Sequence, residues 1–392
     1  MAVLAHLVHG CAACQQTLAP LASFMWRPER SQPPRNHSAG EYDVAIEKAF
    51  ATPEAAGLLS SASHGEIAWA LCESLLEESW QQRHDDAEAM VLLAALAAMV
   101  AESIKPSTRG AAALADLQAR ALADLGNARR VANDLASAET DLLRARRREE
   151  QGTGDRLLVG HLLELTAALR IDQRRFEEAR TLLEWALGVY ESEDARHSAG
   201  KVLTQTAHLS LVGGEPEEAV GLLARALTLL DPVLEPTVLL AAVHNLLDGF
   251  VHCGRFREAG LLLWRTRKLY AAHGGRFYDL RLLWIEGRVA SGLGHRGRAE
   301  RCFRRARGGF LDVRLPYFAA LVATDLAILL LEKGRAAEAR ELIEETLETF
   351  NVLHIRREAV GAMILLNDAV QQEQLSIAAL RQLAAELQKI ER

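Results

Sequence analysis

A period of about 40 residues runs through most of this chain, and it constrains the fold more than any other feature of the sequence. Segments with a Gly or polar turn, followed by Glu and Arg, repeat with an alanine at one fixed place, which we call the marker position. The marker residues are Ala138, Ala179, Ala219, Ala259, Ala299, Ala339 and Ala379, separated by one interval of 41 residues and five of 40. A fixed period of this length indicates a repeat protein, in which each unit packs on its neighbours.

The residues around each marker describe the repeating unit. Residues four positions after the marker are apolar, and those seven positions after it are small, so they form one helix stripe on which a second helix can come close. Glycine stands five positions before the marker at Gly214, Gly254, Gly294 and Gly334, where it suits the left-handed conformation that ends a helix. Each unit is therefore predicted to be a helix A, a tight turn, and a helix B that begins just before the marker.

These features resemble the tetratricopeptide repeat (TPR) family. In that family a Leu-Gly or Leu-Ala pair stands in helix A about twelve residues before the marker, and Leu125-Gly126 and Leu326-Ala327 match it here. The resemblance covers residues 119–392 and implies an all-α, right-handed superhelical solenoid of antiparallel helix hairpins. The family's unit has about 34 residues, so we expect the additional residues to lengthen helix B and its exit loop.

The chain is predicted to have four parts. Residues 1–26 form a short apolar segment with His and Cys, and 27–40 read as a Pro-rich linker. Residues 41–110 are expected to hold a helical cap and an irregular first hairpin, with helices over 64–83 and 85–103 and Ala89 as its marker. Residues 111–392 form the TPR-like solenoid of seven units.

The first segment contains His6, His9, Cys11 and Cys14 within nine residues. A Cys-x2-Cys pair with nearby His is half of a structural zinc site. It is similar to the zinc-binding anti-sigma motif His-x3-Cys-x2-Cys, although Leu7 stands where that motif has its His. A zinc site, an apolar helix with two free thiols, and a redox or lipid role are the interpretations that stay open. The other cysteines, Cys72, Cys253 and Cys302, are expected to be small buried hydrophobes.

Composition and motifs exclude several classes of function. The net charge of −7 disfavours a general nucleic-acid or membrane-surface binder. There is no apolar run long enough to span a membrane and no charged signal-peptide start, which favours a cytoplasmic protein. Gly292-x-Gly294-x-x-Gly297 matches a dinucleotide motif in form only, since it falls in the turn of a helical hairpin rather than between a strand and a helix. With no catalytic motif, we expect a non-enzymatic protein without a cofactor, apart from the zinc question.

In the TPR family helices A line a concave groove, so the resemblance implies a groove surface made of polar helix-A residues. These are Asn127, Arg130, His161, Glu164, Lys201, His208, His244, Asn245, Asp248, Arg281, Trp284, Arg288 and Asp325. Trp and Arg often dominate interface energies, so we hypothesise that Trp284, Arg281 and Arg288 capture an acidic or C-terminal segment of a protein. The alternative is that Trp284 packs between adjacent repeats.

Helices B are expected to carry a basic stripe. Its residues are Arg296, Arg298, Arg301, Arg304, Arg305 and Arg307, with Arg255, Arg257, Arg265, Arg267 and Lys268 one repeat earlier. One interpretation pairs them with acidic residues of the next helix B, and the other makes them a contact for an acidic protein or nucleic acid. The leading function is a scaffold or adaptor that binds a protein or peptide. The alternative is a ligand- or peptide-responsive bacterial regulator of signalling or transcription, with an anti-sigma-like zinc-binding N-terminus.

Overall fold

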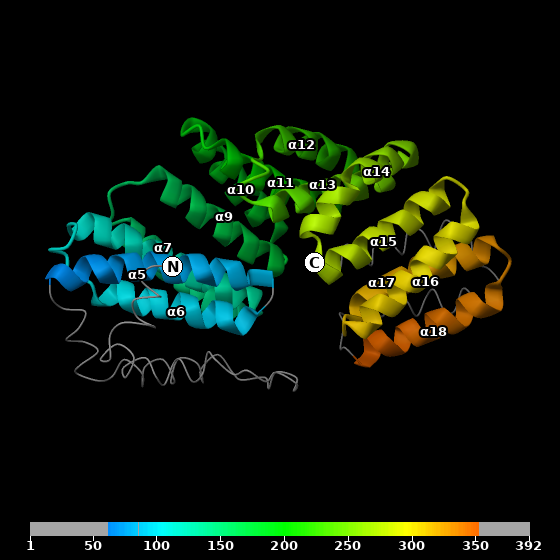
Figure 1. Cartoon of the computed structure of the whole chain (residues 1–392), viewed down its shortest axis with the longest axis horizontal. Helices are drawn as coiled ribbons and strands as arrows, with labels where there is room; N and C mark the ends of the chain where they lie inside the picture. The colour runs from blue at the N-terminus through cyan, green and yellow to red at the C-terminus, as the bar shows by residue number, and fades with distance from the viewer. Residues whose placement is uncertain (1–61, 85, 353–392) are drawn as a thin grey trace. The chain divides into compact units, whose positions relative to one another are not determined.

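The computed structural model describes residues 62–84 and 86–352, and every secondary-structure element among them is helical (Figure 1). This confirms the predicted all-α fold of TPR-like hairpins. The chain divides into two compact units, Met1–Glu193 (unit 1) and Asp194–Arg392 (unit 2). The motif His6, His9, Cys11 and Cys14, the linker 27–40 and the marker Ala379 lie outside the described residues.

Each unit is a row of helical hairpins in which helix A comes first and helix B second. In unit 1 the pairs are α5 (Ala62–Gln81) with α6 (Ala87–Ser103), α7 (Ala111–Val131) with α8 (Leu135–Glu149), and α9 (Arg156–Asp172) with α10 (Phe176–Ser192); the short helix η1 (Gln82–His84) precedes α6. In unit 2 they are α11 (Arg196–Gly213) with α12 (Pro216–Leu229), α13 (Pro236–His252) with α14 (Phe256–His273), α15 (Gly275–Gly292) with α16 (Arg296–Asp312), and α17 (Pro316–Glu332) with α18 (Ala336–Val352). Within each unit, successive helices A also contact one another, as α7 contacts α9 and α13 contacts α15.

The predicted marker stripe forms the contact between the helices of each hairpin. The six markers from Ala138 to Ala339 are completely buried, and each is the fourth residue of its helix B. The residues four positions later are buried as well, while Thr266, seven positions after its marker, is only half-buried. A further buried position lies eleven residues after the marker, at Tyr190, Leu230, Tyr270 and Phe310, and the repeat analysis missed it. Small residues near the start of helix B and large ones at its end therefore set how closely the two helices approach.

The first hairpin has a different marker from the predicted one. Ala89 is half-buried, and the fourth residue of α6 is Met90, which is buried. Ala94, Ala97 and Ala101 continue the buried stripe from Met90 with the spacing found in the later units. A large residue at the marker is accommodated here because small alanines follow it, and a search for a marker alanine therefore misses the register by one residue.

The turn between helix A and helix B has the same geometry in all six hairpins from α7 to α18. The residue five positions before the marker has a positive φ of 60–81°, not only at the four predicted glycines but also at Asn133 and Arg174. The next residue donates its backbone N–H to the carbonyl five residues earlier at 2.8–2.9 Å, as from Arg175 to Arg170. This hydrogen bond is the one that closes a Schellman turn. The turn is thus a property of the repeat, and glycine is its most favourable residue.

In the most regular repeat, formed by α9 and α10, the 40-residue period is divided equally between the two helices. Helices α9 and α10 have 17 residues each, and three residues form each of the connections 173–175 and 193–195. Helix B is therefore not longer than helix A in this repeat and its exit loop is short, whereas six-residue exit loops follow α8 and α12. Asp134 and Asp155 cap α8 and α9 by accepting backbone N–H groups, and proline occupies the first position of α12, α13 and α17.

The three cysteines inside the described helices have structural surroundings. Cys72 and Cys302 are buried as predicted, and Cys253 is half-buried. Burial raises the pKa of Cys72 to about 12, and it raises the pKa of the other two thiols as well. Because the thiolate is the reactive form, these cysteines are poor nucleophiles at neutral pH. None of the helices in the described part of the chain combines the length and apolarity needed to cross a bilayer.

Candidate partner-binding surface

All thirteen residues of the predicted groove lie on helices A, as the register required. They come from α7 (Asn127, Arg130), α9 (His161, Glu164), α11 (Lys201, His208), α13 (His244, Asn245, Asp248), α15 (Arg281, Trp284, Arg288) and α17 (Asp325). Asn127, Arg130, His161 and Glu164 belong to unit 1, and the other nine residues belong to unit 2.

Five of these residues, Asn127, Glu164, His244, Asn245 and Trp284, are buried, and three of the five share one register position. Glu164, His244 and Trp284 are buried, and all three stand fifteen positions before their marker. In α9 and α13 this position faces the tyrosine near the end of helix B of the same hairpin. The Tyr190 hydroxyl donates to Glu164 Oε2 at 3.2 Å, and His244 Nδ1 lies 2.9 Å from the Tyr270 hydroxyl. Their roles are to satisfy buried tyrosine hydroxyls and, for Trp284, to fill the core of unit 2.

In unit 2 an arginine joins three successive helices A. Arg288 Nη1 on α15 donates to Asp248 Oδ1 on α13 at 2.6 Å, and Arg288 Nε lies 3.7 Å from Asp325 Oδ2 on α17. The Trp284 indole N–H also donates to Asp325 Oδ2, at 2.7 Å. The side chains of Arg288, Asp248 and Asp325 are only 14–15% exposed. We call these three residues the Asp–Arg–Asp row.

The row holds two carboxylates around one cation in a largely buried place. Burial raises the pKa of Asp325, and the charge of Arg288 and the hydrogen bond from Trp284 act in the opposite direction. His252 on α13 lies beside the row, with Nε2 3.4 Å from Arg288 Nη2. Arg288 is thus already neutralised within the protein, which is not what a primary anchor for an acidic ligand would show.

Arg281 differs from Arg288 although both lie on one face of α15. It makes no ion pair within the described part of the chain, and its guanidinium carbon lies 5.7 Å from the centre of the Phe277 ring. Lys201 on α11, in contrast, is paired with Glu235 at 3.4 Å. Asn245 is buried and His208 half-buried. Among the described cations of this surface, the half-buried Arg281 is therefore the one without an ion pair, which can pair with an anionic group.

Of the predicted residues of unit 1, Arg130 and His161 make contacts between α7 and α9. His161 Nε2 lies 2.9 Å from Asp124 Oδ1, and Arg130 donates both to Asn127 Oδ1 and, at 2.7 Å, to Asp172 Oδ2. These contacts join neighbouring helices A in the same way as the Asp–Arg–Asp row. Among the described residues there is no group of three or more His, Cys, Asp or Glu that could hold a metal ion.

Unit 1 also contains a small apolar pocket between α8, α9 and α10. Its volume is about 160 Å³, and its lining includes Leu142, Leu162 and Leu182. At its rim Arg170 Nη2 lies 2.9 Å from Glu139 Oε1, so the charged groups there are paired with each other. Pockets for small ligands usually have about 300–1,000 Å³, and this one is a packing gap between helices.

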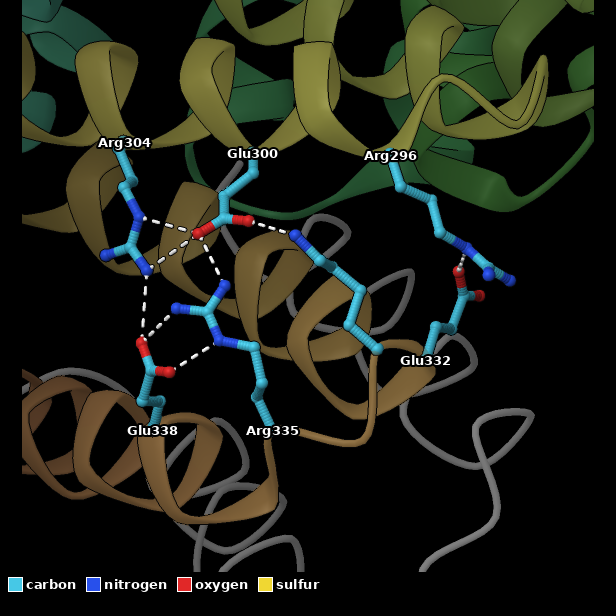
Figure 2. A network of polar contacts seen from close by, with 7 residues as sticks. Arg296, Glu300, Arg304, Glu332, Arg335 and Glu338 are labelled. Carbon is cyan, nitrogen blue, oxygen red and sulfur yellow. Dashed lines mark hydrogen bonds and ion pairs between the residues drawn. The ribbon is translucent and has the colours of Figure 1, made fainter.

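Arg304 of the predicted basic stripe belongs to an ion-pair network between α16, the turn 333–335 and α18, and Arg296 pairs separately with Glu332 of α17 at 3.9 Å (Figure 2). Glu300 accepts from Lys333 at 2.5 Å, from Arg335 at 2.8 Å and from Arg304 at 3.0 Å. Arg304 and Arg335 also contact Glu338 of the next helix B, as predicted for the acidic residues of that helix. Glu139, at the same register in unit 1, pairs with Arg170, Gln173 and Arg175. Recurrence at one register indicates a structural role in joining adjacent repeats.

Replacing Glu300 with glutamine is expected to lower stability by about 1–2 kcal/mol at neutral pH, after allowance for screening of its partly exposed partners by solvent. Lys333, then Arg335 and Arg304, lower the pKa of Glu300 from 4.5 to about 2. Since the folded pKa is the lower one, this stabilisation is complete above pH 4.5 and is lost as the pH falls toward 2. Urea unfolding at several pH values should show the difference between variant and parent shrinking over that range.

The matched control for this measurement is Glu341→Gln. Glu341 is exposed on α18 and makes no ion pair within the described residues, so its replacement should change stability by less than about 0.5 kcal/mol. If both glutamine variants lose the same amount of stability, the Glu300 network contributes nothing of its own.

Comparisons with known proteins bear on the fold. No model of a protein family matches the sequence, and a comparison with curated proteins gives no match. Among solved structures, aspartyl phosphate phosphatase F from Bacillus subtilis is 13% identical, over 86% of this chain and 79% of its own, with a TM-score of 0.56. A Rap protein complexed with competence and sporulation factor is 13% identical, over 82% of this chain and 100% of its own, with a TM-score of 0.50. A tetratricopeptide repeat protein from Parabacteroides merdae is 15% identical, over 76% and 99%, with a TM-score of 0.45. The first two likenesses show a shared helical-repeat fold.

Proposed function

We propose that this chain is a non-enzymatic scaffold or adaptor that binds a protein or peptide segment on the helix-A surface of unit 2. The observation that carries the proposal is Arg281, which has no ion-pair partner within the described residues and lies on the same helix as the paired Arg288. An arginine that has no ion-pair partner and lies beside a row of fixed polar groups can bind a ligand carboxylate, because its guanidinium forms charge-assisted, bidentate hydrogen bonds.

The Asp–Arg–Asp row would bind a different part of the same ligand. Arg288 and Arg281 are seven residues apart on α15, and residues at that spacing lie on one face of a helix. The side chains of the row are 14–15% exposed and include carboxylate acceptors and guanidinium donors, and contacts with α13 and α17 keep these groups in place. Such a mixed row suits the alternating N–H and C=O groups of a peptide backbone, whereas Arg281 selects for an acidic side chain or a free C-terminus.

A structure with the same fold supports the binding of a factor by such a chain. The Rap protein that resembles this chain was solved complexed with competence and sporulation factor. This favours, as a second candidate, a ligand-responsive regulator in which binding to unit 2 acts on another part of the chain. In that case the segment with Cys11 and Cys14 would hold zinc. Elemental analysis of the full chain should then find one zinc per chain, lost in a variant with both cysteines changed to serine.

Replacing Arg281 with glutamine is expected to weaken peptide binding about tenfold, because one charge-assisted hydrogen-bonded pair is lost. The probe is a pool of random decapeptides with free C-termini, retained on the immobilised full chain and identified by mass spectrometry. Affinities of the retained peptides are then measured by calorimetry on parent and variant. Amidation of their C-termini distinguishes a terminal carboxylate from an acidic side chain as the group bound.

Arg147→Gln is the matched control, since Arg147 is an exposed arginine on helix B of unit 1 (α8) and makes no ion pair within the described residues. It should leave these affinities unchanged. Retained peptides whose affinity is the same for the parent, for Arg281→Gln and for the double variant with Arg288→Gln would show that this surface is not the binding site.

A further inference from the structure

The outer faces of helices B in unit 2 differ sharply from one repeat to the next. The buried stripe lies at the marker and four, seven and eleven positions after it, so the positions two, five and six after the marker face away from the hairpin. These exposed residues are Gly221, Ala224 and Arg225 on α12, Leu261, Trp264 and Arg265 on α14, Arg301, Arg304 and Arg305 on α16, and Glu341, Glu344 and Glu345 on α18. The face thus changes from small residues to apolar and basic ones, and then to acidic ones.

On α14 two large apolar side chains are exposed side by side. Trp264 is 70% exposed and Leu261, three residues earlier on the same helix face, is 51% exposed. Within the described residues Trp264 makes no ring contact and its indole N–H has no hydrogen-bond partner. A tryptophan has a large apolar surface whose burial is favourable and an indole N–H that can donate a hydrogen bond, which is why this residue is enriched at interfaces.

The exposed cations around this apolar pair have no partners in the described part of the chain. They are Arg257, Arg265 and Lys268 on α14, with Arg301 and Arg305 on α16. The remaining arginines of α16 are neutralised, as Arg304 is by Glu300 and Glu338 and Arg307 is by Glu345. The excess positive charge of this face is therefore concentrated near Trp264, in a chain whose net charge is −7.

A shared ion pair holds the two helices of this face together. Glu286 on α15 lies 2.9 Å from Arg267 of α14 through Oε1 and 3.7 Å from Arg298 of α16 through Oε2. The same register positions of α14 and α16 face the same side, because these are the helices B of two adjacent repeats. Leu261 thus corresponds to Arg301, and Arg265 to Arg305, so the apolar pair and the five cations form one surface. We call this the α14–α16 face.

We propose that the α14–α16 face is a docking site for an acidic amphipathic helix of a partner protein, separate from the helix-A surface. The apolar side of that helix covers Leu261 and Trp264, and its carboxylates pair with Arg265, Lys268, Arg301 and Arg305. Burial of the apolar pair supplies affinity, and the cations supply orientation and a fast association rate. The mode is that of an amphipathic helix recognised through a few apolar anchors.

A nucleic acid fits this face less well than an acidic helix does. Binding to single strands uses several aromatic side chains on which successive bases stack, and Trp264 is the one exposed aromatic on α14 and α16 within the described residues. The next helix, α18, presents Glu341 and Glu344, whose charges repel phosphates along the continuation of the face. Leu261 would also contact nothing apolar on a phosphate backbone.

The test uses the full chain and a fluorescently labelled synthetic helix of about five turns, roughly 18 residues. The peptide carries Leu and Phe on one face and Glu on the others. Three probes are compared with it by fluorescence anisotropy: a peptide of equal composition with the apolar residues dispersed, a peptide with Lys in place of Glu, and single-stranded and duplex DNA oligonucleotides. We expect the acidic amphipathic peptide to bind and the other three to bind at least about tenfold more weakly.

Substitutions then locate the site. Trp264→Ser should weaken binding of the acidic peptide about 30-fold, as for an interface hot spot. The double variant Arg301→Gln/Arg305→Gln should weaken it about fivefold and reduce its salt dependence. Trp185→Ser is the matched control, since Trp185 is a 61% exposed tryptophan on α10 of unit 1. Arg281→Gln on the helix-A surface should also have no effect, so the two proposed surfaces are tested independently.

Three results would overturn the proposal: equal binding of the dispersed peptide, tighter binding of an oligonucleotide, or unchanged affinity in Trp264→Ser. Trp264, Trp185, Arg301 and Arg305 are exposed and Arg281 is half-buried without an ion pair in the described part of the chain, so these variants are expected to keep the parent's stability. Thermal unfolding followed by circular dichroism verifies this, so a loss of binding is not a loss of folding.

Discussion

Replacing Arg288 with methionine should destabilise unit 2 by about 3 kcal/mol, because it leaves two largely buried carboxylates without their cation. Asp248 and Asp325 come from α13 and α17, and Arg288 is the charge that joins them to α15. Methionine keeps most of the aliphatic stem, so the loss reports the charge and not the packing. Equilibrium unfolding in urea at neutral pH measures this difference, and Arg281→Met, which breaks no ion pair, should cost less than about 1 kcal/mol.

The pH dependence of this variant has a definite sign. Burial already raises the pKa of Asp325 and Arg288 opposes that rise, so removing Arg288 raises the folded pKa further. A carboxyl whose folded pKa lies above its unfolded value destabilises the fold once it ionises, and protonation removes that penalty. The deficit of Arg288→Met should therefore shrink as the pH falls from neutral into the mildly acidic range. Adding Asp325→Asn should restore part of the lost stability at neutral pH, and a deficit that is independent of pH would contradict this account.

Gly287→Ala should destabilise the protein by about 1–2 kcal/mol, although alanine is the better helix former. A Cβ at Gly287 would lie 2.5 Å from Phe303 Cε1 and 2.6 Å from its Cδ1, and the Phe303 ring is buried and belongs to the core of unit 2. Overpacking of a core costs about 1–3 kcal/mol, which outweighs the gain of about 1 kcal/mol from helix propensity. The two residues are therefore complementary, a glycine on helix A with a large ring on helix B.

The other repeats provide the control for this prediction. Ala167 faces Leu183, and Ala327 faces Ile343, at the same two register positions where Gly287 faces Phe303. In a Phe303→Leu background, Gly287→Ala should accordingly become stabilising, by about 0.5–1 kcal/mol. The double-mutant cycle should give a coupling of about 1.5–3 kcal/mol. Additive effects of the two substitutions would mean that the ring and the glycine are not matched to each other.

The repeat fold could be predicted from the sequence because its contacts recur in the chain. Wherever helix A meets helix B, a small residue is needed at the same place in every unit, and a turn with positive φ is needed just before it. These demands leave a 40-residue pattern that can be read without coordinates, and the buried markers and the recurrent turn confirm it. The pattern failed in the first hairpin, where the buried residue at the marker position is Met90 and not an alanine.

Only the tertiary structure decided which polar side chains are buried or already have partners within the protein. Glu164, His244 and Trp284 have the helical spacing of surface residues, yet each is buried. Arg281 and Arg288 are alike in sequence, but only Arg288 meets carboxylates, and these belong to helices about 40 residues away in either direction. Helix periodicity defines the face on which a residue lies, whereas its partner and its exposure depend on how neighbouring helices pack. For that reason the availability of Arg281 and the exposure of Trp264 could be found only once the helices had been placed beside one another.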